Sequence, residues 1–176
     1  MRIIGIDPGY AIVGFGVVDY IGGKFSVKDF GAITTDKDTP FPKRLCEIYE
    51  DYCQILDSWK PDALSIERLY FTNNQKTGID VAQARGIIIM AAAQRGIEIN
   101  EYTPLQVKQA VVGYGQAVKK QVQEMTKNIL KLSCVPKPDD TADALAMTIC
   151  HAQTSGSLLR NIKASNCLLY TSDAAD

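Results

Sequence analysis

The sequence predicts an α/β fold in which a mixed sheet of about five strands carries helices on both of its faces. Two observations lead to this prediction. Three strand-like segments follow one another at the start of the chain, and helical and strand-like segments alternate after them. Strands joined by tight turns pair antiparallel, whereas strands separated by a helix pair parallel, so both kinds of pair are expected. The 176 residues are enough for one domain with a sizeable core.

Five segments have the apolar composition of strands, and turn residues or helices separate them. Pro8-Gly9 ends the first segment, and Gly22-Gly23 forms a tight turn between the second and the third. Pro61-Asp62 separates the fourth from the helix before it. The expected strands are residues 2–7, 12–20, 24–34, 63–67 and 97–102.

Five other segments carry helix signals. Apolar residues recur at helical spacing in the first of them, and Gly96 is suited to end the second. Thr103-Pro104 is a typical helix start, and Gly113-Tyr114-Gly115 predicts a flexible turn between the third and the fourth. The expected helices are residues 42–60, 81–95, 105–112, 118–132 and 139–152.

The helix at residues 81–95 is apolar around most of its circumference, and a polar loop or helix entry at residues 70–77 precedes it. A helix of this kind is buried on both sides. In so small a domain we expect one side to face a second subunit. Gly86, at the middle of the helix, would let another backbone approach closely.

Charge is unevenly distributed along the chain. The net charge of −1 excludes a globally basic nucleic-acid binder. Residues 104–137, however, contain six lysines and a single acid, Glu124. This basic strip is either a solvated helix face or a surface that binds phosphates.

Composition also limits the class of protein. No apolar run is long enough to cross a bilayer, and the chain opens directly on a strand pattern, so we expect no signal peptide. The five cysteines show no CxxC spacing, which indicates reduced thiols in the cytoplasm and no zinc site. The single histidine, His151, is interpreted as a structural or surface residue.

Four carboxylates are the candidate functional residues. Asp7 and Glu67 each end an apolar strand, and Asp140 and Asp143 share one face of the last helix. Each also has an ordinary interpretation, as a turn residue, a solvated strand end or a helix N-terminal acid. Spacing does not choose between Asp139 and Asp140 as the partner of Asp143. If the segments converge, their oxygens would suit Mg²⁺ and the hydrolysis of a phosphodiester.

Longer motifs give the chain a resemblance to RuvC-type Holliday junction resolvases (crossover junction endodeoxyribonucleases) over about residues 1–155. The set of motifs in this order is highly specific, although GIDPG alone is shared with many proteins. The matching stretches are GIDPG with GFGVV, IERLYFTNN, QARGIIIMAA, YTPLQVKQAVVGYGQAVKKQVQ and DDTADALAMTICH.

The resemblance implies a ribonuclease-H-like fold and an endonuclease of homologous recombination and DNA repair. It implies that four-way junction DNA is cut by paired symmetric nicks, with two Mg²⁺ ions per subunit that Mn²⁺ can replace. It also implies a homodimer in the bacterial cytoplasm and the branch-migration proteins RuvA and RuvB as partners. By motif position, the catalytic and metal-binding acids are Asp7, Glu67, Asp140 and Asp143.

The same motifs assign further residues. Lys108 and Lys119 match lysines that approach the DNA backbone, and Lys120 is an additional basic residue. Either Tyr70 or Phe71 falls where a base-stacking aromatic residue is expected. The helix that contains QARGIIIMAA becomes the expected dimer face, with Gly86, Ile87 and Met90 as its interface residues.

The end of the chain requires a separate interpretation. Residues 167–176 read CLLYTSDAAD, which resembles a translated sequencing adapter rather than a native C-terminus. A genuine short tail is the alternative. We expect residues 1–155 to form the nuclease domain and residues 156–166 a disordered C-terminal tail.

Two other functions compete with the nuclease. An actin-like kinase or ATPase also opens with a G-I-D-x-G hairpin, but it needs a second domain and an adenosine-binding glycine motif, for which this chain has no room. A junction-binding module without catalysis is the second alternative, and the presence of all four acids argues against it.

Overall fold

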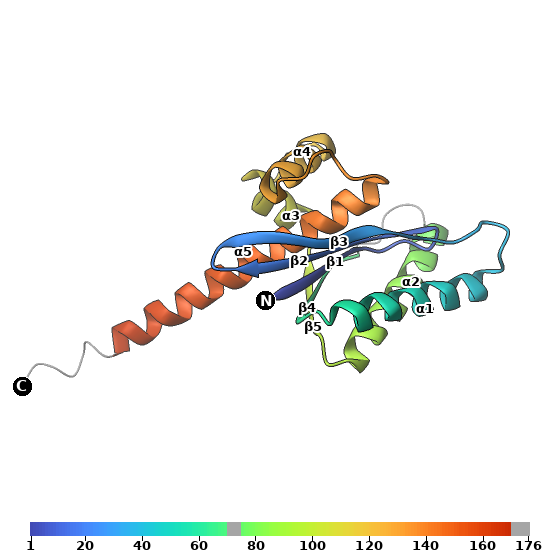
Figure 1. Ribbon diagram of the computed structural model, residues 1–176, viewed down its shortest axis with the longest axis horizontal. Coiled ribbons are helices and arrows are strands. Elements are labelled where there is room, and N and C mark those ends of the chain that lie inside the picture. The colour runs from blue at the N-terminus through green and yellow to red at the C-terminus, as the bar shows by residue number, and fades with distance from the viewer. Residues whose placement is uncertain (70–74, 170–176) are drawn as a thin grey trace, which may run out of the picture.

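The computed structural model describes residues 1–69 and 75–169, which form five strands and five helices (Figure 1). In chain order the elements are β1 (Arg2–Asp7), β2 (Ile12–Ile21), β3 (Lys24–Thr34), α1 (Phe41–Trp59), β4 (Ala63–Glu67), α2 (Gln75–Gln94), β5 (Glu98–Tyr102), α3 (Pro104–Val112), α4 (Lys119–Leu130) and α5 (Asp139–Leu169).

The strands form one sheet in the order β3-β2-β1-β4-β5. The β1–β2 and β2–β3 pairs are antiparallel, and the β1–β4 and β4–β5 pairs are parallel. Tight turns join the antiparallel strands, and helices join the parallel ones, as the chain order requires. The predicted mixed five-stranded sheet is therefore confirmed.

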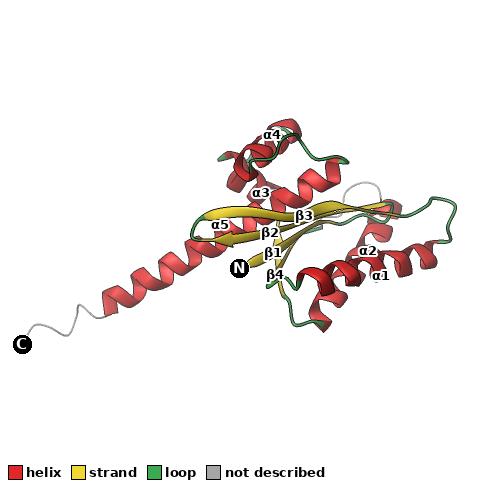
Figure 2. Ribbon diagram, in the orientation of Figure 1, coloured by secondary structure: helices red, strands yellow, loops and turns green. Residues whose placement is uncertain are grey.

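Helices cover both faces of the sheet. Figure 2 shows α1 and α2 against one face and α3, α4 and α5 against the other. Along β1 and β4 successive side chains alternate between these faces. Ile4, Ile6, Leu64 and Ile66 point into the core shared with α1 and α2. The intervening residues, Asp7 and Glu67 among them, therefore face α5.

α5 lies unusually close to β1 and β2, because three glycines form the sheet surface beneath it. A Cβ atom on Gly14 would lie 2.0 Å from the carbonyl oxygen of Asp140, and one on Gly5 would lie 2.0 Å from that of Ala144. A Cβ on Gly16 would meet Leu145 Cδ2 at 2.6 Å. These distances are far below van der Waals contact, so the helix can occupy this position only over glycine.

Two helix bounds differ from the prediction by more than two residues. α2 begins at Gln75, because its polar opening turns adopt helix without the apolar repeat that marks residues 81–95. α5 continues to Leu169, and its last part extends beyond the sheet (Figure 1). This segment contains no proline to interrupt the helix. α5 thus includes residues 156–166, for which we expected a disordered tail, and the division into domain, tail and artefact stays a prediction.

Other expectations can be compared within the described part of the chain. Cys46, Cys53, Cys134 and Cys150 are free thiols there. None of the helices in that part combines the length and hydropathy needed to cross a bilayer.

The contact between α5 and the sheet makes a prediction about stability. Gly14→Ala should lower the free energy of unfolding by about 1–3 kcal/mol or more, because the added methyl group overpacks the backbone of α5. Urea unfolding followed by circular dichroism measures the change.

Gly78→Ala is the matched control, because a Cβ at Gly78 meets nothing within 4 Å. It should leave the protein as stable or more stable by about 0.5–1 kcal/mol, as expected for glycine replaced by alanine in a helix. Equal stability of the two variants would contradict the proposed constraint.

Candidate active site

Asp7 and Glu67 lie at the same edge of the sheet. β1 and β4 are parallel neighbours, and their pairing runs to Ile6 opposite Ile66, one residue before each acid. Parallel strands end at the same edge, and both acids face α5. The two carboxylates are therefore brought together by the register of the sheet.

The start of α5 places the second pair of acids above this edge. Gly14, which pairs with Asp7 in the sheet, lies against the backbone of Asp140. Further along, Ser65 Oγ donates a hydrogen bond to the carbonyl oxygen of Met147 at 2.7 Å, which fastens α5 to β4. Asp140 and Asp143 thus stand over the ends of β1 and β4.

A cleft of about 220 Å³ opens at this position. Acidic and basic side chains share it, and apolar residues from α3, α4 and α5 complete its walls. Its lining consists of Asp7, Glu67, Pro104, Val107, Lys108, Lys119, Val122, Asp143, Ala146 and Met147. Asp140 is half-buried beside this lining rather than part of it.

The acids are electrostatically coupled. Burial, and after it the neighbouring carboxylates Asp143, Glu67 and Asp140, together raise the pKa of Asp7 to about 8 against the opposing charge of Lys119. Burial also raises the pKa of Glu67 and of Asp143. These effects come from the convergence of negative charge in a desolvated place, which is typical of functional sites.

The choice between Asp139 and Asp140 acquires a structural argument. The charge of Asp140 contributes to the raised pKa of Asp7, and Asp139 is not among the causes of that rise. Asp139 instead approaches Lys137, with 2.5 Å between Nζ and Oδ1, and this ion pair lowers the pKa of Asp139. Of Asp139 and Asp140, it is therefore Asp140 whose charge acts on Asp7.

Two lysines enter the cleft from the helices after β5. Thr103 caps α3, with its Oγ1 accepting a hydrogen bond from the backbone N–H of Gln106 at 3.2 Å, and so fixes the helix that carries Lys108. Lys119 opens α4, and its Nζ lies 2.8 Å from Asp143 Oδ2 and 3.9 Å from Asp139 Oδ2. Lys119 thus supplies a positive charge among the acids.

Whether a metal ion fits this cleft depends on the oxygen ligands that its acids offer. Carboxylate oxygens are the ligands that Mg²⁺ prefers, and three of them line one cleft. In the part of the chain that the structure describes, however, no three His, Cys, Asp or Glu side chains are close enough together to hold a metal ion as they stand. Like charges repel, and the Lys119 ammonium already pairs with Asp143, so the ligands would have to close around a metal.

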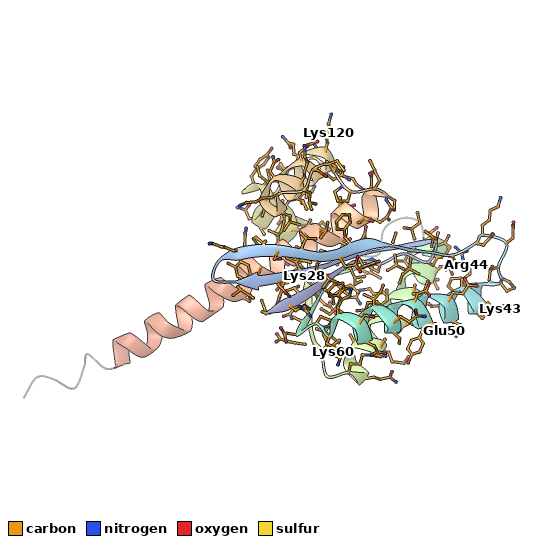
Figure 3. The ribbon with its side chains drawn as sticks, viewed as in Figure 1. Lys28, Lys43, Arg44, Glu50, Lys60 and Lys120 are labelled. Carbon is orange, nitrogen blue, oxygen red and sulfur yellow. The ribbon has the colours of Figure 1, made fainter. Side chains whose placement is uncertain are left out.

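Among the described residues, Lys120 is the predicted DNA-binding residue that falls outside the cleft lining. Lys120 is exposed on α4 and projects away from the sheet (Figure 3). Tyr70 and Phe71 lie outside the described residues.

The predicted dimer face is the outer side of α2. Met90 is 46% exposed, Gly86 is exposed, and Ile87 is half-buried. Ile87 and Met90 line an apolar groove together with Leu45, Cys46, Tyr49 and Glu50 of α1. The inner side of α2 is in the core, through residues such as Ala84 and Ile88. The single chain therefore leaves an apolar helix face uncovered.

Two residues gain roles that the sequence did not specify. His151 is buried, and its Nδ1 lies 2.8 Å from the hydroxyl oxygen of Tyr102, which agrees with a structural role. Arg85 was not singled out, yet its Nε donates a hydrogen bond to the carbonyl oxygen of Glu67 at 3.0 Å. An arginine within an otherwise apolar helix face was the available signal.

Comparisons with known proteins identify relatives of this chain. A family model described as crossover junction endodeoxyribonuclease RuvC matches residues 3–151. The RuvC of Ruminiclostridium cellulolyticum is 55% identical over 92% of this chain and 98% of its own length. The RuvC of Brevibacillus brevis is also 55% identical, over 87% of this chain and 92% of its own.

Solved structures agree with these relatives. Thermus thermophilus RuvC in complex with a Holliday junction substrate superposes with a TM-score of 0.82 at 34% identity, covering 86% of this chain and 93% of that chain. The yeast mitochondrial Holliday junction resolvase Ydc2 shares the fold, with a TM-score of 0.64 at 15% identity, over 92% of this chain and 82% of its own. The family model and the relatives together show that the chain belongs to the crossover junction endodeoxyribonuclease RuvC family.

Proposed function

We propose that this member of the RuvC family is a Mg²⁺-dependent endonuclease that resolves four-way (Holliday) DNA junctions by paired symmetric nicks. Its role would lie in homologous recombination and DNA repair in the bacterial cytoplasm. The observation that carries the proposal is the cleft in which Asp7, Glu67 and Asp143 meet beside Lys108 and Lys119. A cleft with this mixture of charges suits a metal ion together with a phosphodiester.

The metal ligands in this proposal are Asp7, Glu67, Asp140 and Asp143. Two Mg²⁺ ions held there would activate a water molecule and stabilise the leaving oxygen of the phosphodiester. Mn²⁺, which also accepts carboxylate ligands, is the expected substitute. The raised pKa of Asp7 supports this assignment, because burial and the neighbouring carboxylates both disfavour its charged form, and a cation would favour that form.

The lysines have a complementary role in the proposal. Lys108 and Lys119 would neutralise phosphates beside the reacting bond, and Lys120 would contact the DNA backbone farther out. In this structure Lys119 pairs with Asp143. A metal bound at Asp143 would compete with that ion pair and leave the Lys119 ammonium free for a phosphate. Tyr70 or Phe71 would stack on a base of the junction.

A homodimer would place two such sites on one junction. The uncovered face of α2, with Gly86, Ile87 and Met90, is the proposed contact between subunits. Two copies related by a twofold axis present the same patch to one another, and each nicks one strand. Family membership supports RuvA and RuvB as the partners that deliver the junction.

A synthetic four-way junction tests the proposed function. With Mg²⁺ the wild-type protein should produce symmetric nicks, and with EDTA it should produce none. Asp140→Asn should lower the nicking rate at least about 100-fold. The decrease should exceed the one that follows the loss of a residue that only supports a metal ligand, because Asp140 is itself a proposed ligand. Denaturing gels measure the rate, and gel retardation in Ca²⁺ measures junction binding.

Asp139→Asn is the matched control, one residue away on the same helix. Its carboxylate pairs with Lys137, and we expect nicking within about threefold of the wild type, as for a surface ion pair. Junction binding without nicking by the wild type would favour the binding module. Hydrolysis of ATP without junction binding would favour the kinase alternative.

The raised pKa of Asp7 predicts how stability depends on pH. The native state holds the Asp7 proton up to about pH 8, whereas the unfolded chain releases it near the ordinary value of 3.8. Between these two pH values the native state binds more protons than the unfolded state. The free energy of unfolding is therefore highest below the unfolded pKa of Asp7 and falls as the pH rises toward 8.

Asp7→Asn should remove much of that loss. In EDTA at pH 8 the variant should be more stable than the wild type by at least about 1 kcal/mol, since a pKa difference of one corresponds to about 1.4 kcal/mol. At pH 4 the two should be similar. Urea unfolding across this range measures the difference, with Asp38→Asn, an exposed acid in a loop, as the control. If the free energy of unfolding changes with pH in the same way for the wild type and for Asp7→Asn, the prediction is wrong.

The dimer contact makes a separate prediction. Met90→Glu should weaken dimerisation about tenfold or more, because a buried unpaired charge costs several kcal/mol. Sedimentation velocity at micromolar concentration measures the shift from dimer to monomer. Met125→Glu is the control, because Met125 is also partly exposed, at 37%, but lies on α4. A monomeric wild type, or an equal effect of both variants, would exclude this face as the interface.

A further inference from the structure

Arg85 joins α2 to the ends of two strands at the active-site edge of the sheet. Its Nε donates a hydrogen bond to the carbonyl oxygen of Glu67 at 3.0 Å, at the end of β4. Its Nη2 lies 3.0 Å from Oε1 of Glu101, in β5. The Arg85 side chain is 14% exposed and that of Glu101 is 42% exposed, so the ion pair is shielded from water on the arginine side only. Within the described residues Nη2 makes no hydrogen bond, and the bond from Nε to the Glu67 carbonyl oxygen is therefore the directional contact of this side chain.

Glu67 needs this support because it is the last residue of its strand. Pairing with β1 ends at Ile66, and Glu67 is paired only with Tyr102 on the β5 side. The backbone N–H of the next residue, Arg68, donates one hydrogen bond to the carbonyl oxygen of Tyr102 at 2.8 Å. On the β1 side the sheet itself no longer restrains Glu67, and Arg85 contacts the carbonyl group of this residue.

The same turn of α2 carries the proposed dimer contact. Gly86 and Ile87 follow Arg85 directly and belong to the uncovered face. Ala84 precedes it and is fully buried in the core. Arg85 thus leaves α2 between its buried side and its exposed side and reaches the end of β4.

We propose that Arg85 is a positioning residue that orients Glu67 for metal binding. The inference rests on the proposed function, because it takes Glu67 to be a metal ligand. Groups that hold a metal ligand from behind commonly change metal affinity or activity about 10–100-fold when they are removed.

Three variants separate the parts of this bridge. Arg85→Gln removes the charge and the guanidinium fork, and Arg85→Lys keeps the charge but loses the fork. Glu101→Gln removes the ion pair and leaves the bond from Arg85 to Glu67 in place. Calorimetry measures the binding of Mn²⁺ to the protein without DNA, and thermal unfolding shows how much each change costs the fold.

Arg85→Gln should weaken Mn²⁺ binding about tenfold, and the Mg²⁺ concentration that gives half-maximal junction nicking should rise by a similar factor. Junction affinity in Ca²⁺ at saturating concentration should stay close to the wild type. Arg85→Lys should lie between, and Glu101→Gln should bind Mn²⁺ like the wild type even where it unfolds at a lower temperature.

Wild-type Mn²⁺ affinity in a folded Arg85→Gln protein would overturn the inference, since Arg85 would then support the fold alone. If Arg85→Gln does not fold, the comparison of Arg85→Lys with Glu101→Gln decides, and equal Mn²⁺ affinities would overturn it. A wild type that neither binds Mn²⁺ nor nicks junctions would instead overturn the proposed function, and the inference with it.

Discussion

The close contact between α5 and the strands β1 and β2 is the constraint on which the site depends. Glycine at positions 5, 14 and 16 lets the helix backbone lie directly on the sheet. The first turn of α5 thereby descends to the level at which β1 ends, and Asp140 and Asp143 come within electrostatic reach of Asp7. Larger side chains at these positions would hold the helix off the sheet. The acids would then belong to separate surfaces rather than to one cleft.

The grouping of these carboxylates lowers the stability of the folded protein. Carboxylates that are buried near one another favour their protonated forms, and Asp7 shows the effect most strongly. Lys119 offsets part of the cost through its ion pair with Asp143, which lowers the pKa of that acid against the effect of burial. A bound divalent cation would offset more. Stability in the absence of metal is thus reduced by the same grouping that makes metal binding favourable.

The sequence predicted the sheet well because its strands are apolar and separated by clear turns. It also placed Asp7 and Glu67 at strand ends, which the parallel register of β1 and β4 brings together. It could not show why α5 comes so close, because the role of Gly14 depends on a helix that begins more than a hundred residues later. Spacing also could not separate Asp139 from Asp140. Their difference arises from which neighbours each one meets in space, and the polar start of α2 likewise has no apolar repeat.

The sheet separates two tasks onto its two faces, and β4 is where they meet. Asp7, Glu67 and the start of α5 occupy one face, whereas α2 packs on the other and leaves an apolar side outward. The end of β4 has no ladder partner on its β1 side, because the pairing with β1 ends at Ile66. Arg85 reaches the backbone of Glu67 at this point, so an arginine of α2, on the opposite face of the sheet, contacts a residue of the cleft.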